Sequence, residues 1–177
     1  EYLQEKKLKL EIIEYTLRES PSGAYLGLTL SESGSEISLE STGVGIVDAC
    51  YNALMSGFAD RYPSLSSIEL TDAYFRTNVR TGLETDISMK SRMVINLEFK
   101  NKSKNRMSFS SKTSSVSYSA VSTLVRAFEF YMNCEMLFKR LRFLVEEAQE
   151  RNRSDIAQKY YYALSKVVEV TNYRCVL

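Results

Sequence analysis

The chain has 177 residues, of which 44% are hydrophobic and 25% charged, with 23 Lys and Arg side chains against 22 Asp and Glu. This composition is typical of a globular domain, and a net charge of +1 gives no overall field that would attract nucleic acid or an anionic membrane. The chain contains no His, which excludes imidazole acid–base chemistry, Ser-His and Cys-His nucleophile pairs and His-containing metal sites. We therefore expect no catalysis by this chain alone.

Three cysteines, Cys50, Cys134 and Cys175, lie far apart in apolar surroundings and form no Cys-x-x-Cys pair. This spacing indicates buried thiols in a reducing compartment and gives no zinc or redox motif. No apolar run reaches the ~20 residues that cross a bilayer, and the first residues lack the basic-then-apolar order of a signal peptide. We therefore expect a cytoplasmic protein without a membrane partner.

The first third of the chain reads as three strands and a helix. Alternating apolar residues predict strands at 8–18, 24–30 and 36–40, with a turn at Ser33 and Gly34 between the last two. After Gly45 the apolar residues recur at steps of three and four, which predicts an amphipathic helix that ends near Gly57.

The next segment repeats that order. Residues 67–79, 92–99 and 106–110 have strand patterns, and a helical pattern begins at about Val116, with Ser117 or a neighbouring Ser as its N-cap. The chain therefore shows strand-strand-strand-helix twice, which indicates an internal duplication of architecture.

Beyond Asn133 the pattern is that of a long helix, with an apolar stripe over residues 136–148, followed by a second helix over 154–170. These two helices are predicted to form a hairpin. The expected fold class is α+β, with two βββα units in residues 1–133 and a C-terminal helical extension in residues 134–177.

Residues 40–54 read Glu-Ser-Thr-Gly-Val-Gly-Ile-Val-Asp-Ala-Cys-Tyr-Asn-Ala-Leu. This segment resembles the glycine-led turn and helix in the C-terminal regulatory domain of 2-isopropylmalate synthases and citramalate synthases, where Gly-x-Gly-Pro-Val-Asp-Ala-Ala precedes an aliphatic helix. Residues 125–133, Val-Arg-Ala-Phe-Glu-Phe-Tyr-Met-Asn, are similar to the family's Ala-Arg-Ala-Tyr run that ends in Asn. That family also has two βββα units, and the resemblance runs from about residue 8 to residue 133.

The resemblance implies a non-catalytic feedback-sensing domain that binds leucine or isoleucine near the interface of a homodimer. It also implies a catalytic barrel, in the same chain or in a partner, that forms 2-isopropylmalate or citramalate. Backbone N–H groups at a glycine-led helix start suit the carboxylate of an amino acid, and an acidic side chain suits its ammonium group. No cofactor, metal ion or nucleic acid is expected. The implied effector-binding residues are Gly45, Ile46, Val47, Asp48, Ala49, Val116 and Ser117.

Departures from the family pattern leave an alternative open. Ile46 stands where the family has Pro, and Ser115 and Ser119 stand where it has Gly and Asp before the second helix. The alternative is a structural or assembly module that has kept this fold, lost the effector and uses its C-terminal helices for protein–protein interaction. Gly43 and Gly45 would then form only a tight strand-to-helix turn.

Two polar segments could be interpreted as a hydroxyl nucleophile site or a phosphate-binding site. The serines in residues 108–122 are interpreted as strand, turn and cap positions, because no base is available to activate a hydroxyl. The basic run from Lys100 to Arg106 is short and lacks interleaved aromatic residues, which favours a solvated hairpin tip over a phosphate-binding site.

Overall fold

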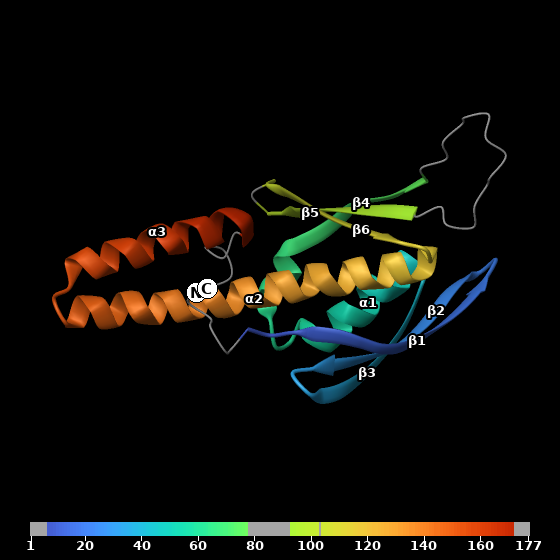
Figure 1. Cartoon of the computed structure of the whole chain (residues 1–177), viewed down its shortest axis with the longest axis horizontal. Coiled ribbons are helices and arrows are strands. Elements are labelled where there is room, and N and C mark those ends of the chain that lie inside the picture. The colour runs from blue at the N-terminus through green and yellow to red at the C-terminus, as the bar shows by residue number, and fades with distance from the viewer. Residues whose placement is uncertain (1–6, 78–92, 103, 172–177) are drawn as a thin grey trace.

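The computed structural model describes residues 7–77, 93–102 and 104–171. Two three-stranded antiparallel sheets enclose helices, and a helical hairpin extends from one end (Figure 1). This arrangement confirms the predicted α+β fold with two βββα units and a helical pair. In chain order the elements are β1 (Leu10–Ser20), β2 (Gly23–Glu32), β3 (Ser35–Gly43), α1 (Ile46–Phe58), the short 3-10 helix η2 (Pro63–Ser67), β4 (Ile68–Thr77), β5 (Met93–Asn101), β6 (Arg106–Thr113), α2 (Val116–Glu150) and α3 (Ser154–Thr171).

The observed boundaries lie close to those expected, with two differences. Residues 78, 79 and 92, which the sequence pattern assigns to strands, lie outside the described residues. The helical stretches predicted on either side of Asn133 form one unbroken helix, α2, of 35 residues. The expected turn between β2 and β3 is confirmed, because both Ser33 and Gly34 have the positive φ angles (52° and 96°) that a tight hairpin turn requires.

The duplication extends to the detail of strand pairing. The sheets have the orders β1-β2-β3 and β4-β5-β6. In each sheet the first strand carries a register shift at its fourth residue, Ile13 in β1 and Thr71 in β4. Such an extra residue increases the local twist and interrupts regular pairing. The middle and last strands of both sheets pair without a shift.

The main core lies between the sheets, where α1 packs on β2 and β3 and the first half of α2 packs on β5 and β6. The first half of α2 is buried on most sides because it also contacts α1 and β1. Aromatic rings join the layers: Tyr51 of α1 and Phe128 of α2 meet edge to face with centroids 5.7 Å apart. Phe99 of β5 and Tyr131 of α2 meet in the same way at 5.8 Å.

Polar side chains of α2 hold the segment that leads into β1. The side-chain amide of Asn133 donates to the Leu8 carbonyl and accepts from the Leu8 N–H, both at 2.9 Å. One turn earlier, a Glu129 carboxylate oxygen accepts from the Leu10 N–H at 2.9 Å. Asn133 is 8% exposed, so these bonds satisfy backbone groups that water reaches poorly.

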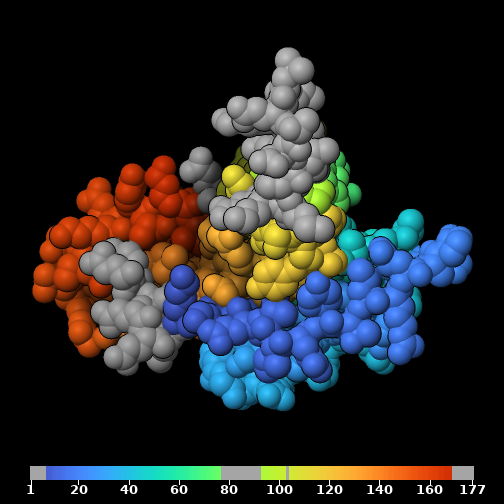
Figure 2. All heavy atoms as spheres, turned by 45° about the vertical axis from the view of Figure 1, so that its right-hand side comes forward, coloured from blue at the N-terminus to red at the C-terminus, as the bar shows by residue number. Residues whose placement is uncertain are grey.

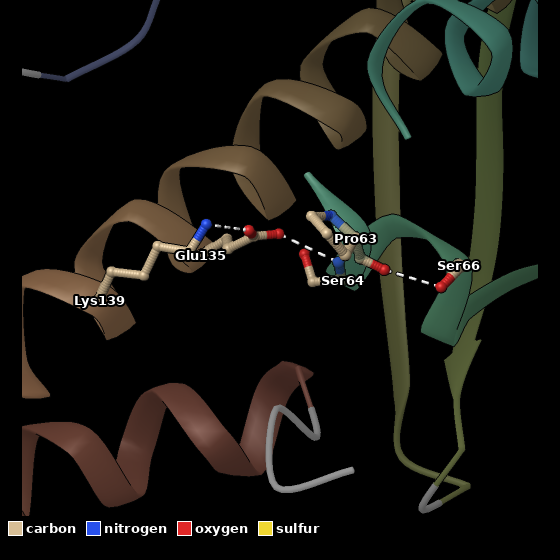
Figure 3. A network of polar contacts seen from close by, with 5 residues as sticks. All are labelled: Pro63, Ser64, Ser66, Glu135 and Lys139. Carbon is tan, nitrogen blue, oxygen red and sulfur yellow. Dashed lines mark hydrogen bonds and ion pairs between the residues drawn. The ribbon is translucent and has the colours of Figure 1, made fainter. Parts of the chain in front are cut away.

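A second polar contact attaches η2 to α2 where the helix leaves the sheets (Figure 3). The buried carboxylate of Glu135 accepts from the Ser64 N–H at 3.0 Å and from the Lys139 ammonium at 2.6 Å. Beyond this point α2 packs on α3 through a separate apolar cluster that includes Phe138, Leu141 and Val167.

Loss of the Asn133 amide is expected to destabilise the fold. In Asn133→Ala the two Leu8 backbone groups lose their partner while remaining poorly hydrated, which should lower the free energy of unfolding by about 1–3 kcal/mol. Urea denaturation followed by circular dichroism measures this change. Asn52→Ala, which removes one exposed bond to the Thr42 carbonyl, is the control and should change stability by less than ~0.5 kcal/mol. Equal effects of the two substitutions would contradict the assigned role of Asn133.

Candidate functional site

The first backbone N–H groups of α1 have no side-chain cap from the described residues. Gly45 is the N-cap residue, with extended backbone angles (φ −153°, ψ −176°), and no side chain in the described part of the chain caps this helix. The first N–H groups of a helix have no partner within the helix, so they are available to a ligand or to water. The adjacent turn is fixed from the side, because an Asp48 carboxylate oxygen accepts from the Val44 N–H at 2.9 Å.

An open depression of about 560 Å³ lies beside this turn. Its walls come from the β1–β2 hairpin, the end of β3 and the first turns of α1. Figure 2 shows the hairpin tip, in blue, projecting beside the segment that contains the start of α1. The charged and polar side chains that line the depression include Arg18, Glu19, Tyr25, Asp48 and Asn52. Residues of both charge signs therefore line the depression, with Arg18 and Glu19, which are consecutive in β1, on opposite faces of the sheet.

Tyr25 is the fixed aromatic element of this depression. Its hydroxyl donates to a Glu40 carboxylate oxygen at 2.9 Å, and this bond raises the pKa of Tyr25. The Arg18 guanidinium lies over the same ring, 5.9 Å from its centroid. A cation held over an aromatic face is partly preorganised, so Tyr25 restricts the positions that the Arg18 guanidinium takes.

The structure divides the predicted residues of the first unit between surface and core. Asp48 lines the depression, and Gly45 lies at the helix start next to it. Ala49 is fully buried, and Ile46 and Val47 are half-buried against the main core. Only their backbone groups therefore belong to a site at this surface.

The start of α2 differs from that of α1 because a side chain caps it. The Ser115 hydroxyl caps the helix by accepting from the Tyr118 N–H at 3.2 Å, which confirms the prediction of a serine N-cap. The Ser117 hydroxyl lies 3.1 Å from the Tyr15 hydroxyl of β1 and 3.2 Å from that of Ser115. Val116 is exposed. Neither Val116 nor Ser117 lines the depression beside α1, although both helices start at the same end of the molecule (Figure 1).

The neighbouring serines have structural partners. Thr113 and Ser119 hydroxyls are 2.5 Å apart, and Ser111 and Thr123 hydroxyls are 2.6 Å apart. These bonds join β6 to the first turns of α2, so the interpretation of the serine-rich segment as strand, turn and cap positions is confirmed.

Other groups in the described residues offer little reactive chemistry. Burial raises the pKa of the Cys50 thiol to about 12 and that of Cys134 to about 11, so both stay protonated near neutral pH. Cys175 lies outside the described residues. Within the described ranges, no three His, Cys, Asp or Glu side chains gather in a way that would hold a metal ion. None of the helices in these ranges is both long and apolar enough to cross a membrane.

Sequence reasoning missed the residues that the β1–β2 hairpin brings to the site, above all Arg18, Glu19 and Tyr25. They precede the α1 start by more than 20 residues and carry no motif, so only the strand pairing places them there. Comparisons of this chain with models of known protein families and with curated proteins found no match. The resemblance to the synthase regulatory domain therefore stays a prediction.

The two glycines of the turn are expected to differ in their tolerance of a side chain. A Cβ atom at Gly43 would lie 2.8 Å from the Asp48 carbonyl carbon and still closer to the Ala49 nitrogen, whereas one at Gly45 would meet nothing within 4 Å. Gly43→Ala should therefore lower the free energy of unfolding by about 1–3 kcal/mol, and Gly45→Ala by less than ~0.5 kcal/mol. Urea denaturation of the two variants measures both values, and a destabilised Gly45→Ala would show that this position is needed for folding.

Proposed function

We propose that this chain is a non-catalytic regulatory domain that binds a free branched-chain amino acid, leucine or isoleucine, at the start of α1. The observation that carries the proposal is the uncapped start of α1 beside a depression with both signs of charge. The second helix start, closed by Ser115 and Ser117, serves as the internal contrast.

The chemistry of an amino acid matches these groups. Its carboxylate would meet the free N–H groups of the first α1 turn and the Arg18 guanidinium. Its ammonium group would meet Asp48 or Glu19, which line the same depression. Val44, which is 90% exposed, and the ring of Tyr25 offer apolar surface to a branched side chain.

Regulation would act through a homodimer. Val44, Val116 and Tyr118 are exposed apolar residues next to the two helix starts, and a second copy over this end would cover them and enclose the open depression. A ligand that binds one dimer arrangement more tightly shifts the population toward it. The arrangement would then control a catalytic barrel, in the same chain or in a partner, in the cytoplasm.

A specific observation also favours the alternative of an assembly module. The helical hairpin exposes three aromatic side chains: Phe143 is 55% exposed, Tyr161 49% and Tyr162 68%. Exposed aromatic residues on a projecting hairpin suit protein–protein contact. In that case the chain would bind a partner through α2 and α3 and no amino acid at α1.

Direct binding separates these two functions. In isothermal titration calorimetry and thermal-shift assays, leucine or isoleucine should bind, and ligand at about 100 times its Kd should stabilise the fold by ~2.7 kcal/mol. Arg18→Ala and Gly45→Leu should each weaken binding at least ~10-fold while leaving the protein folded, because Arg18 is at the surface and a Cβ at Gly45 meets open space.

Arg142→Ala is the control, because it removes a guanidinium from the far hairpin, where Arg142 lies 3.8 Å from Glu146. Its affinity should match that of the unsubstituted protein. Absence of binding by any branched-chain amino acid would reject the proposed effector and favour the assembly module. Binding that Arg18→Ala and Gly45→Leu leave unchanged would reject the site.

A further inference from the structure

The two sheets expose four edge strands, and these differ in how they are protected from further pairing. The register shifts at Ile13 and Thr71 lie in β1 and β4, and a bulge of this kind disrupts an edge that would otherwise recruit another strand. The start of β1 is also bound by Glu129 of α2. The other two edges, β3 and β6, pair regularly over nine and eight residues and contain no Pro.

The outer side of β3 is open to a partner strand. In the described part of the chain, no strand lies beside β3 other than β2 (Figure 1). The Thr42 carbonyl, at the end of β3, accepts from the Asn52 side chain of α1. Because backbone direction alternates along a strand, the N–H and C=O groups of Glu36, Ser38 and Glu40 face the same free side as that carbonyl.

The charges on these two edges are opposite. On the outward face of β3 the charged residues are Glu36 and Glu40, both exposed. On that of β6 they are Arg106 and Lys112, also exposed. Glu36 and Lys112 make no ion pair with any residue of the described ranges, and Arg106 makes only a long one, 3.4 Å, to Glu98.

The inward faces of the same strands also match. Leu39 of β3 and Phe109 of β6 lie half-buried at the margins of the core. At a free edge each of them lacks a neighbour on one side. A strand added there would extend the covered apolar surface of both sheets.

We propose that β3 of one copy pairs with β6 of a second copy, joining the first sheet of one molecule to the second sheet of the next. In antiparallel pairing Glu36 lies opposite Lys112 when Leu39 lies opposite Phe109. In this register charge and apolar character both match, and the occupant of each edge is another copy of this chain.

This contact joins unlike surfaces, so it is head-to-tail. Each added copy presents a further free β3 and a further free β6, and the assembly closes into a ring or continues as a filament. It is therefore separate from the homodimer proposed above, which would cover the starts of α1 and α2. Its formation does not depend on amino-acid binding.

Charge reversal at the two edges tests the pairing. In sedimentation velocity at low salt, the unsubstituted protein should form species larger than a dimer, in an amount that rises with concentration and falls with added salt. The variants E36K/E40K and R106E/K112E should each be no larger than a dimer, because like charges then oppose one another and weaken the contact at least ~10-fold. An equimolar mixture of the two variants should again form large species, because opposite edges meet between them.

The control variants E14K on β1 and R140E on α2 carry charge reversals away from both edges and should assemble like the unsubstituted protein. Circular dichroism of all variants checks that they are folded. Three results would overturn the proposal: an unsubstituted protein that never exceeds a dimer, edge variants that still assemble, or a mixture of edge variants that does not recover large species.

Discussion

The burial of one helix by two sheets is the constraint on which the remaining structure depends. The first half of α2 contacts β5 and β6 on one side and α1 and β1 on others, so most of its side chains are buried. A helix of that kind is stable only while both βββα units cover it. The two units therefore fold onto a shared element, and Glu129 and Asn133 secure the first unit to it by bonding the backbone that leads into β1.

The duplicated architecture has diverged at the points where each helix begins. At α2, hydroxyl groups of Ser115 and Ser117 occupy the end of the helix and tie it to Tyr15. At α1, Gly45 contributes no side chain, and Asp48 supports the turn from within. The strand-to-helix connection of the second unit thus caps its own helix, whereas that of the first unit leaves the first backbone N–H groups of α1 without a side-chain cap among the residues that the structure describes. A ligand site on only one of the two units requires this difference.

Most of the fold could be predicted because apolar residues recur at different spacings in strands and in helices. The alternating spacing is clear in strands such as β2 and β5. The length of α2 could not, since nothing in the residues around Asn133 distinguishes a helix that ends from one that continues. Only part of the site could be predicted in this way: Gly45 and Asp48 are three residues apart in sequence, whereas strand pairing brings Arg18 to the same depression. Gly43, not Gly45, proved to be the glycine that close packing demands.

The unbroken course of α2 gives the molecule a mechanical property. A helix of 35 residues is about 52 Å long, and α2 passes from the core into the hairpin without a proline, a glycine or any non-helical residue to act as a hinge. A partner that pulls on the hairpin tip would therefore tilt the same rod on which both sheets rest. The Glu135–Ser64 contact lies where α2 leaves the sheets, so it joins that rod to η2 at the same point.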